Sequence, residues 1–308
     1  MRAFSIPMRT RFRGLTRRDG ALIEGPAGWG EFSPFAEYGP AEAARWLAAA
    51  REAAFTGFPE PLRDRIPVNV TVPAVGPGRA REIVLASSGC RTAKVKVAER
   101  GQDHREDLER VEAVRDALGP GGRVRIDVNG GWDVDTAVRM IGMLNRFDLE
   151  YVEQPCATVE ELALVRRRVD VPVAADESIR RAEDPFLVRK AEAADIAVLK
   201  VQPLGGVAAA LEVAEQIGLP VVVSSAVETS VGLAAGLALA AALPVLPYAC
   251  GLATLQLLEG DVAADPLTVE DGMIAVRRPS VDEAALARFE VDAEGWRLRA
   301  EQADGHGR

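Results

Sequence analysis

The sequence has few of the side chains that thiolate metal sites and histidine chemistry require. Its three cysteines, Cys90, Cys156 and Cys250, are far apart and form no C-x-x-C pair. Its two histidines, His104 and His306, are too few to favour a zinc site or a histidine general base. Scattered cysteines in odd number favour reduced core thiols and a reducing, cytoplasmic compartment. Any chemistry is therefore expected from lysines and carboxylates.

The sequence also lacks a long apolar segment and an excess of basic charge. Nothing at its start has the apolar core of a signal peptide, and the most apolar run, 231–246, contains Pro244 and is shorter than the roughly 18 to 20 residues that cross a bilayer. A net charge of −9 and a pI near 5.0 disfavour nucleic acid and membranes as partners. We expect a small anionic carboxylate substrate, and the sequence gives no indication of the oligomeric state.

What the chain does contain is a series of short apolar runs separated by segments with helical spacing. Between Thr92 and Lys200 these runs are TAKVKV, VRIDVN, LEYVEQP, VPVAADES and DIAVLK. Such an alternation is typical of βαβ units and a parallel sheet. VNVTVPAV before the series and LPVVVSS after it extend the sheet, and a weak strand at 244–247 is expected to close a barrel. An open Rossmann sheet is the alternative, but no G-x-G-x-x-G follows the first strand.

The two ends of the chain predict a second, smaller unit. Residues 1–65 are expected to form an α+β cap, in which strands over 2–13 and 21–31 are joined by a turn at TRRDG and followed by the helix PAEAARWLAAAREAAF. Residues 66–270 are expected to form the barrel. A short strand and helix within 271–300 are expected to return to the cap.

Lys94 and Lys96 lie in one predicted strand and point to the same side of it. Two ammonium groups so close together would disfavour each other's protonation, which would lower the pKa of one and prepare it as a base. The alternative is an exposed edge strand with two solvated lysines.

Three carboxylates end or follow the next predicted strands: Asp127, Glu153 and Asp176. They would repel one another unless lysines or a cation lie between them. Oxygen ligands without histidine or cysteine favour Mg²⁺. Asn129 shares a face with Asp127 and would lie nearby. Taken singly, each acid is equally well explained as a helix N-cap or a surface charge.

Lys200 ends the run DIAVLK, about four strands away from Lys96, so the two lysines would face each other across the barrel. A lysine base beside Mg²⁺ is a known arrangement for abstracting a proton α to a carboxylate. A Schiff-base lysine is the alternative for Lys200. Ser224 and Ser225 end the following strand and could hold an anionic substrate group or cap a helix.

Taken in order, these motifs resemble the enolase superfamily, in its muconate-lactonizing-enzyme-like branch. The matching motifs are the K-x-K of TAKVKV, the Asp of RIDVNGGW, the Glu of YVEQP, the Asp-Glu of VAADES and the Lys of VLKVQPLGG. Within that branch, FRG near Phe12, GWGEFSPFAEY and SSAVETSVGL are most similar to o-succinylbenzoate synthases. The first turn, GLTRRDG, looks short beside the lid loop of many relatives.

The resemblance implies a fold and a set of roles. The fold would be α/β, a modified TIM barrel of (β/α)7β form with an α+β capping domain. Mg²⁺, or Mn²⁺ in its place, would be bound by the three carboxylates. Lys96 would remove the α-proton of a cyclohexadiene carboxylate and protonate the departing hydroxyl, Lys200 would stabilise the enediolate, and Lys94 would tune Lys96. The resulting activity would be dehydration to o-succinylbenzoate in menaquinone biosynthesis. N-succinylamino-acid racemase, dipeptide epimerase and a metal-binding scaffold without turnover are the alternatives.

Overall fold

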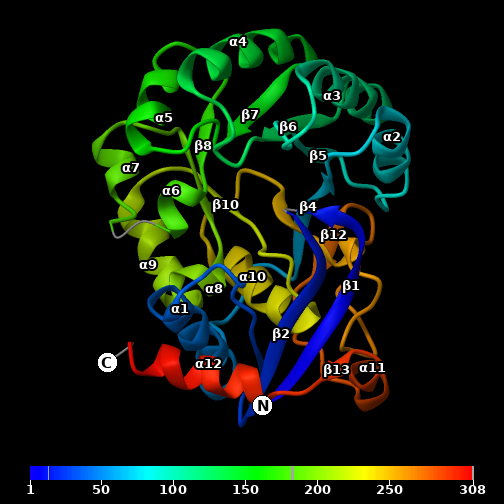
Figure 1. Cartoon of the computed structure of the whole chain (residues 1–308), viewed down its shortest axis with the longest axis vertical. Coiled ribbons are helices and arrows are strands. Elements are labelled where there is room, and N and C mark those ends of the chain that lie inside the picture. Colours follow the sequence, from blue (N-terminus) through cyan, green and yellow to red (C-terminus); the bar gives the residue numbers. More distant parts are fainter. Residues whose placement is uncertain (13, 182–183, 307–308) are drawn as a thin grey trace.

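Eight parallel strands form a curled sheet in the computed structural model, which describes residues 1–12, 14–181 and 184–306 (Figure 1). Each strand pairs with its neighbour in chain order, and the last strand pairs with the first. A parallel bridge between Ser224 and Gly251 brings the two ends of the sheet together. The strands are β4 (Arg65–Val72), β5 (Thr92–Lys96), β6 (Arg123–Asp127), β7 (Leu149–Glu153), β8 (Val173–Ala175), β9 (Ile196–Leu199), β10 (Val221–Val223) and β11 (Cys250–Ala253).

Helices connect successive strands and cover the outside of the sheet (Figure 1). They are α2 (Pro77–Leu85), α3 (His104–Leu118), α4 (Val134–Leu144), α5 (Val159–Arg166), α7 (Leu187–Lys190), α9 (Val207–Ile217) and α10 (Ser230–Ala242). Short helices α6 (Glu177–Arg180) and α8 (Val201–Leu204), which were not predicted, begin directly after β8 and β9. Seven strand–helix units and a final strand confirm the predicted (β/α)7β fold.

Alternation along the strands separates an outer core from the interior of the barrel. In β5, Ala93 and Val95 belong to the large hydrophobic cluster shared with the helices, whereas Lys94 and Lys96 are buried on the other face. A smaller cluster fills the barrel interior, made of Tyr151, Ala174, Ile196, Val198 and Val222. The strands are therefore buried on both sides, so the charges they carry are held away from water.

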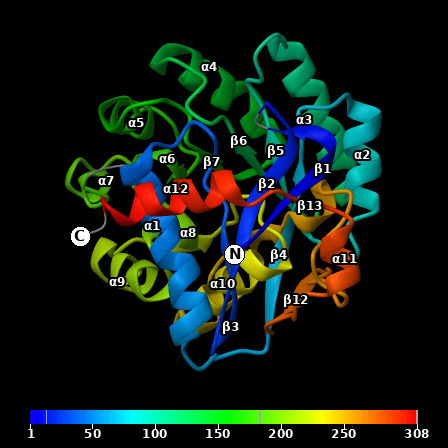
Figure 2. The same cartoon turned by 60° about the horizontal axis from the view of Figure 1, so that its bottom comes forward.

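The cap is an antiparallel sheet in the order β13-β1-β2-β3, made of β1 (Arg2–Phe12), β2 (Leu15–Gly25), β3 (Gly28–Phe32) and β13 (Glu290–Val291). Helix α1 (Pro40–Arg51) packs against β3, and the C-terminal helix α12 (Glu294–Asp304) lies across α1 (Figure 2). Helix α11 (Glu283–Ala287) precedes β13, whereas β12 (Met273–Ala275) pairs with β4 of the barrel. The limits proposed for the two domains stay a prediction.

The turn predicted at TRRDG is wrong. Thr16 to Gly20 lie within β2, and Phe12 of β1 already pairs with Leu15, so β2 begins before TRRDG. Arg13 of the FRG motif lies outside the described residues. Gly20 is explained by packing: a Cβ there would lie 2.5 Å from the Phe4 ring. Gly20 was therefore interpreted as a turn residue, whereas the Phe4 ring is what requires a glycine at this position.

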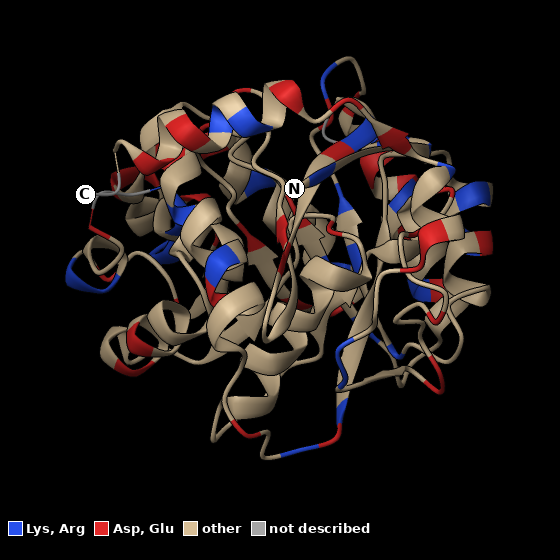
Figure 3. Cartoon of the chain, turned by 90° about the horizontal axis from the view of Figure 1, so that it is seen from below, with Lys and Arg blue, Asp and Glu red and all other residues tan. Residues whose placement is uncertain are grey.

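The closing strand and one helix also differ from their predicted positions. The last barrel strand is β11, not 244–247, because Pro244 and Pro247 lack the N–H groups that a ladder requires. The segment with helical spacing between VPVAADES and DIAVLK forms the single turn α7 and no long helix in its described residues. None of the helices in the described residues is both long and apolar enough to cross a membrane. Figure 3 shows acidic and basic residues interspersed along the outer helices, with both signs also on strands in the middle of the view.

Candidate active site

The charged residues predicted from the sequence gather at the carboxyl ends of β5 to β9. Lys94, Lys96, Asp127 and Lys200 line one cavity, whose volume is about 20 Å³. Glu153 and Asp176 are fully buried beside it, each bonded to one of these lysines. The cavity has room for about one water molecule, which is smaller than any six-membered-ring carboxylate. A substrate can therefore bind only if the residues at the carboxyl ends of the strands, which form the mouth of the barrel, move apart.

Lys94 is bound between two carboxylates. Its Nζ lies 2.9 and 3.0 Å from the two oxygens of Glu153 and 3.2 Å from Oδ2 of Asp127. Burial acts to lower the pKa of Lys94, but the charges of Glu153 and Asp127 outweigh it and hold that pKa well above its usual range. Lys94 is therefore not the one lysine whose pKa was expected to be lowered, because the carboxylates of Glu153 and Asp127 contact its ammonium directly.

Lys96 is nearer the opening. Its Nζ donates to Oδ2 of Asp127 at 2.5 Å and to Oδ1 of Asn129 at 2.6 Å. The ring of Phe12, at the tip of the β1–β2 hairpin, lies 5.2 Å from the same ammonium. An apolar ring over one side of the amine limits its access to water, which favours proton transfer to a bound substrate over exchange with solvent.

Lys200 lies across the cavity, directly after β9. Its Nζ donates to Oδ2 of Asp176 at 2.5 Å, and Nε of Arg180 donates to Oδ1 of the same carboxylate at 2.9 Å. Burial lowers the pKa of Lys200, partly against the attraction of Asp176. Arg180 also donates to the Tyr38 hydroxyl, which connects this carboxylate to the cap.

The three carboxylates are brought together by the register of the sheet. Asp127 and Glu153 are paired residues on β6 and β7. The side chain of Gln154 accepts from the Asp176 backbone N–H at 3.0 Å, which holds Asp176 beside Glu153. Burial and the nearby Asp127 raise the pKa of Glu153 to about 7, whereas lysines hold the pKa of Asp127 below its usual range against burial. Buried oxygen ligands that repel one another are the donor set a hard divalent cation fits.

Within the described residues, no three His, Cys, Asp or Glu side chains converge as a ready-made metal site. Lysines and Arg180 contact the oxygens of all three carboxylates. A cation would fit this donor set once ammonium groups turn toward a substrate.

The predicted substrate residues also line the cavity. Asn129 has a φ of 50°, and its amide donates to Oε1 of Glu177 at 3.1 Å while its oxygen accepts from Lys96. Ser224 and Ser225 lie on the opposite wall, where Oγ of Ser225 accepts from the N–H of Val227 at 2.9 Å. Ser225 thus stabilises its own loop, whereas the cap of α10 is Thr229.

Several residues of the site were not predicted from the sequence: Phe12, Thr71, Gln154, Arg180 and Thr254.

The amino-acid composition contains a further signal for the lysines of the site, since the chain has four lysines against 33 arginines. Three of those four are the buried lysines of this site, and Lys190 is exposed. A chain that otherwise uses arginine retains lysine where an amine is needed.

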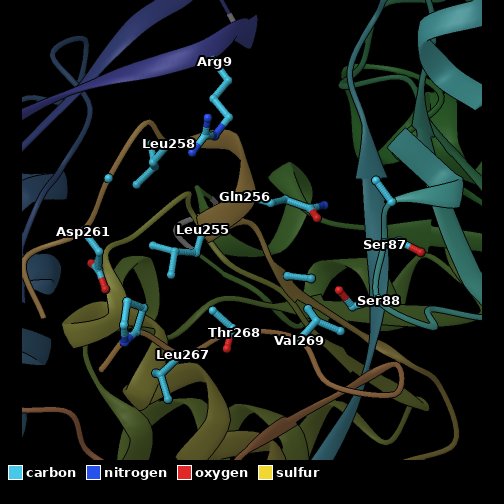
Figure 4. Close-up of a pocket in the computed structure, with 14 residues that line it drawn as sticks. Arg9, Ser87, Ser88, Leu255, Gln256, Leu258, Asp261, Leu267, Thr268 and Val269 are labelled. Carbon is cyan, nitrogen blue, oxygen red and sulfur yellow. The ribbon is translucent and has the colours of Figure 1, made fainter. Parts of the chain in front are cut away.

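A second cavity, of about 350 Å³, lies away from these charges (Figure 4). Figure 4 shows Arg9 of β1 at one side, Ser87 and Ser88 after α2 at another, and Asp261 on the loop after β11. None of the predicted residues lines it. Its lining contains no lysine, whereas the smaller cavity brings amines and carboxylates together.

With this geometry established, comparison with known proteins identifies the family. Residues 78–280 match the family described as "Enolase C-terminal domain-like", and residues 3–54 match "Enolase N-terminal domain-like". The chain belongs to the enolase superfamily.

Curated relatives of this superfamily member are similar over nearly their whole length. The o-succinylbenzoate synthase of Thermobifida fusca is 73% identical over 298 residues, covering 97% of this chain and 94% of the relative. That of Mycolicibacterium smegmatis is 57% identical over 297 residues, covering 95% and 91%. The protein is therefore an enzyme, as predicted.

Solved structures agree on the fold. Muconate lactonizing enzyme from Pseudomonas fluorescens, complexed with muconolactone, superposes with a TM-score of 0.81 at 23% identity, covering 94% of this chain and 97% of that one. A dipeptide epimerase from Enterococcus faecalis, complexed with Mg and a dipeptide, gives 0.77 at 22% identity, with 91% and 96% covered. The predicted superfamily, branch and barrel-with-cap fold are confirmed.

Proposed function

We propose that this enzyme is an o-succinylbenzoate synthase, a carbon–oxygen lyase that dehydrates 2-succinyl-6-hydroxy-2,4-cyclohexadiene-1-carboxylate in menaquinone biosynthesis. The 73% identity to the Thermobifida fusca enzyme carries the proposal. The placement of Lys96 and Lys200 in one cavity supports it, because the reaction needs an amine at the α-carbon.

Asp127, Glu153 and Asp176 would hold Mg²⁺, or Mn²⁺ in its place, once the lysines release their oxygens. When bound, such a cation acts as a Lewis acid that stabilises negative charge on the substrate carboxylate. Gln154 would keep the spacing of two of these ligands through its bond to the Asp176 N–H. Arg180 would orient the Asp176 carboxylate through its bond at 2.9 Å.

Lys96 would carry both proton transfers. As a neutral amine it takes the α-proton, and the C–H electron pair moves into the carboxylate to give an enediolate. The C–O bond to the ring hydroxyl then breaks, and the ammonium of Lys96 returns its proton to the leaving oxygen, which departs as water. The ring becomes aromatic in this step, which lowers its barrier.

Lys200 and Lys94 would act as cations. Lys200 faces the cavity opposite Lys96, so its ammonium can stabilise the enediolate from the other side of the ring. Lys94 stays protonated, since its carboxylate partners raise its pKa, and its charge would hold Glu153 and Asp127 in place. Asn129, Ser224 and Ser225 would contact the substrate.

A second activity is favoured by the same pair of lysines. Amines on opposite faces of one α-carbon can remove a proton on one side and return it on the other, as N-succinylamino-acid racemases and dipeptide epimerases would require. With a substrate that has no hydroxyl to lose, the same two lysines would catalyse racemisation instead of dehydration.

The test is a pair of assays on the purified enzyme. We expect formation of o-succinylbenzoate, followed by its absorbance, to depend on added Mg²⁺ and to be abolished by a chelator. Exchange of the α-proton of N-succinylamino acids in deuterated water is measured beside it. Racemisation without dehydration would overturn the assignment in favour of the racemase.

The three cysteines are buried and unpaired, which supports the reducing, cytoplasmic setting expected from the sequence.

A further inference from the structure

One wall of the active cavity is a strained loop. Val227 has a φ of 63°, a left-handed conformation that a β-branched residue rarely adopts. Ser225, Ala226 and Val227 line the cavity together with Lys200. The loop must be held in this form by its surroundings, because the conformation is unfavourable by itself.

The bonds that hold the loop come from two sides. Within the loop, the Val227 N–H donates to Oγ of Ser225 at 2.9 Å, and the Ala226 N–H donates to Oε2 of Glu228 at 2.7 Å. From the cap, Nε of Arg18 donates to the Val227 carbonyl at 3.0 Å. Arg18 is the cap residue that contacts the strained peptide.

Arg18 is itself fixed in place. It lies on β2 and is 2% exposed. Its Nη2 donates to the carbonyl and to Oγ of Ser33, at 2.5 and 2.9 Å, and its guanidinium lies 4.7 Å from the centre of the Phe35 ring. Because the planar guanidinium of Arg18 is held by several partners, its orientation is fixed, and it can fix the position of the Val227 carbonyl that it contacts.

Two buried carboxylates, Glu31 and Glu228, also lie at this contact between the cap and the barrel. Glu31 of β3 accepts from the N–H and hydroxyl of Thr229 at 3.0 and 2.5 Å and from the Gly232 N–H at 3.2 Å, so it caps α10 from the cap domain. The charge of Arg18 acts on both Glu31 and Glu228. Cap strands and loop 224–229 therefore form one hydrogen-bonded unit directly behind the cavity wall.

We propose that Arg18 is a positioning residue of the reaction: it holds Val227 in its left-handed conformation and thereby fixes the wall formed by residues 224–227 against the substrate. This inference rests on the proposed function and adds a role for the cap that requires no contact between Arg18 and the substrate.

The first experiment replaces the guanidinium. In Arg18→Met we expect kcat/KM for dehydration to fall about 10- to 100-fold, as for a misplaced positioning group. Arg17→Met is the matched control, since Arg17 is the exposed neighbour on the same strand and its side chain bonds to Ser5. Arg18→Lys keeps the positive charge beside Glu31 and Glu228 but lacks the fork, and we expect it to keep the fold while losing activity.

The second experiment relieves the strain instead. Glycine adopts a positive φ freely and alanine does not, while both remove the valine side chain. With Arg18 present, we expect Val227→Gly and Val227→Ala to differ by less than about 2-fold in kcat/KM; in the Arg18→Met or Arg18→Lys background, glycine should exceed alanine by about 5- to 30-fold. A merely structural arginine would not produce this difference between backgrounds.

Amide hydrogen exchange of residues 224–229 gives a readout that needs no turnover. We expect faster exchange there in the Arg18 variants, with exchange elsewhere in the barrel unchanged. Equal behaviour of glycine and alanine in both backgrounds, or faster exchange throughout the chain, would overturn the proposal. If the unchanged enzyme forms no o-succinylbenzoate, the proposed function fails and the exchange of this loop alone decides the role of Arg18.

Discussion

The barrel mouth and the contact between cap and barrel both bury charged groups, but the cations that line the cavity at the mouth are lysines, whereas the cation at the cap contact is Arg18. At the mouth, Lys94, Lys96 and Lys200 bond to carboxylates around a small cavity. At the cap contact, Arg18 lies near Glu31 and Glu228 in a densely bonded unit. Both clusters are removed from water, so the difference lies in what each cation can do.

A lysine ammonium is a compact charge on a flexible stem and can lose its proton when buried, whereas a guanidinium stays charged and holds several partners in one plane. The mouth needs groups that exchange a proton and turn from carboxylate to substrate. The cap contact needs a group that stays charged and does not turn. Three of the four lysines of the chain lie at the mouth.

The largest expected effect comes from removing the amine at the mouth. Lys96→Ala should reduce dehydration by more than about 10⁴-fold, since general acid–base catalysis contributes roughly 10²- to 10⁴-fold and this lysine would act in two steps. The measurement is kcat with the folded state checked by circular dichroism. Unchanged turnover would contradict the role of Lys96 as the base and remove the contrast between the two clusters.

A charge-preserving change tests whether lysine itself is required. Lys200→Arg should lower kcat by about 10²- to 10³-fold, the usual loss when one stabilising group is misplaced. Lys190→Arg is the control, because Lys190 is exposed and pairs with Asp184 on the surface at 2.7 Å. Full activity of Lys200→Arg would show that the mouth needs only positive charge.

The contact between cap and barrel should make the free energy of unfolding depend on pH. Burial, against the charge of Arg18 and with the charge of Glu228, raises the pKa of Glu31 to about 7. A carboxyl that binds its proton more tightly when folded stabilises the fold fully below about pH 4.5, and this contribution is lost as pH rises through 7. The free energy of unfolding should therefore fall by up to about 3 kcal/mol over that range.

Glu31→Gln should flatten this dependence, as measured by urea unfolding at pH 5 and pH 8. Glu24→Gln, at an exposed position on β2, serves as the control and should keep the slope. An unchanged slope in Glu31→Gln would show that the donors from Thr229 and Gly232 keep the carboxyl ionised throughout.

The smallest effect is expected outside both clusters. Asp103 caps α3, and its carboxylate accepts from the N–H groups of Arg105 and Glu106 at 3.0 Å. Asp103→Ala should lower the free energy of unfolding by about 1 kcal/mol with no change in kcat. A loss of activity here would mean that stability in general, and not the two charged clusters, limits the reaction.

The sequence by itself determined the periodic parts of this protein. Apolar runs and the segments with helical spacing between them predicted the barrel strands from β4 to β10, because these signals depend on neighbours within a few residues. The order of Lys96, Asp127 and Glu153 at strand ends predicted their meeting, since parallel strands that pair in order bring their carboxyl ends together.

Only the tertiary structure decided the contacts between distant segments. Gly20 was taken for a turn residue because nothing near it in the chain reveals the Phe4 ring. The raised pKa of Lys94 depends on carboxylates from two other strands, and the bond from Arg18 to Val227 joins residues 209 positions apart. Local sequence patterns carry no record of such partners, because burial and charge at one residue are set by whatever the fold packs against it.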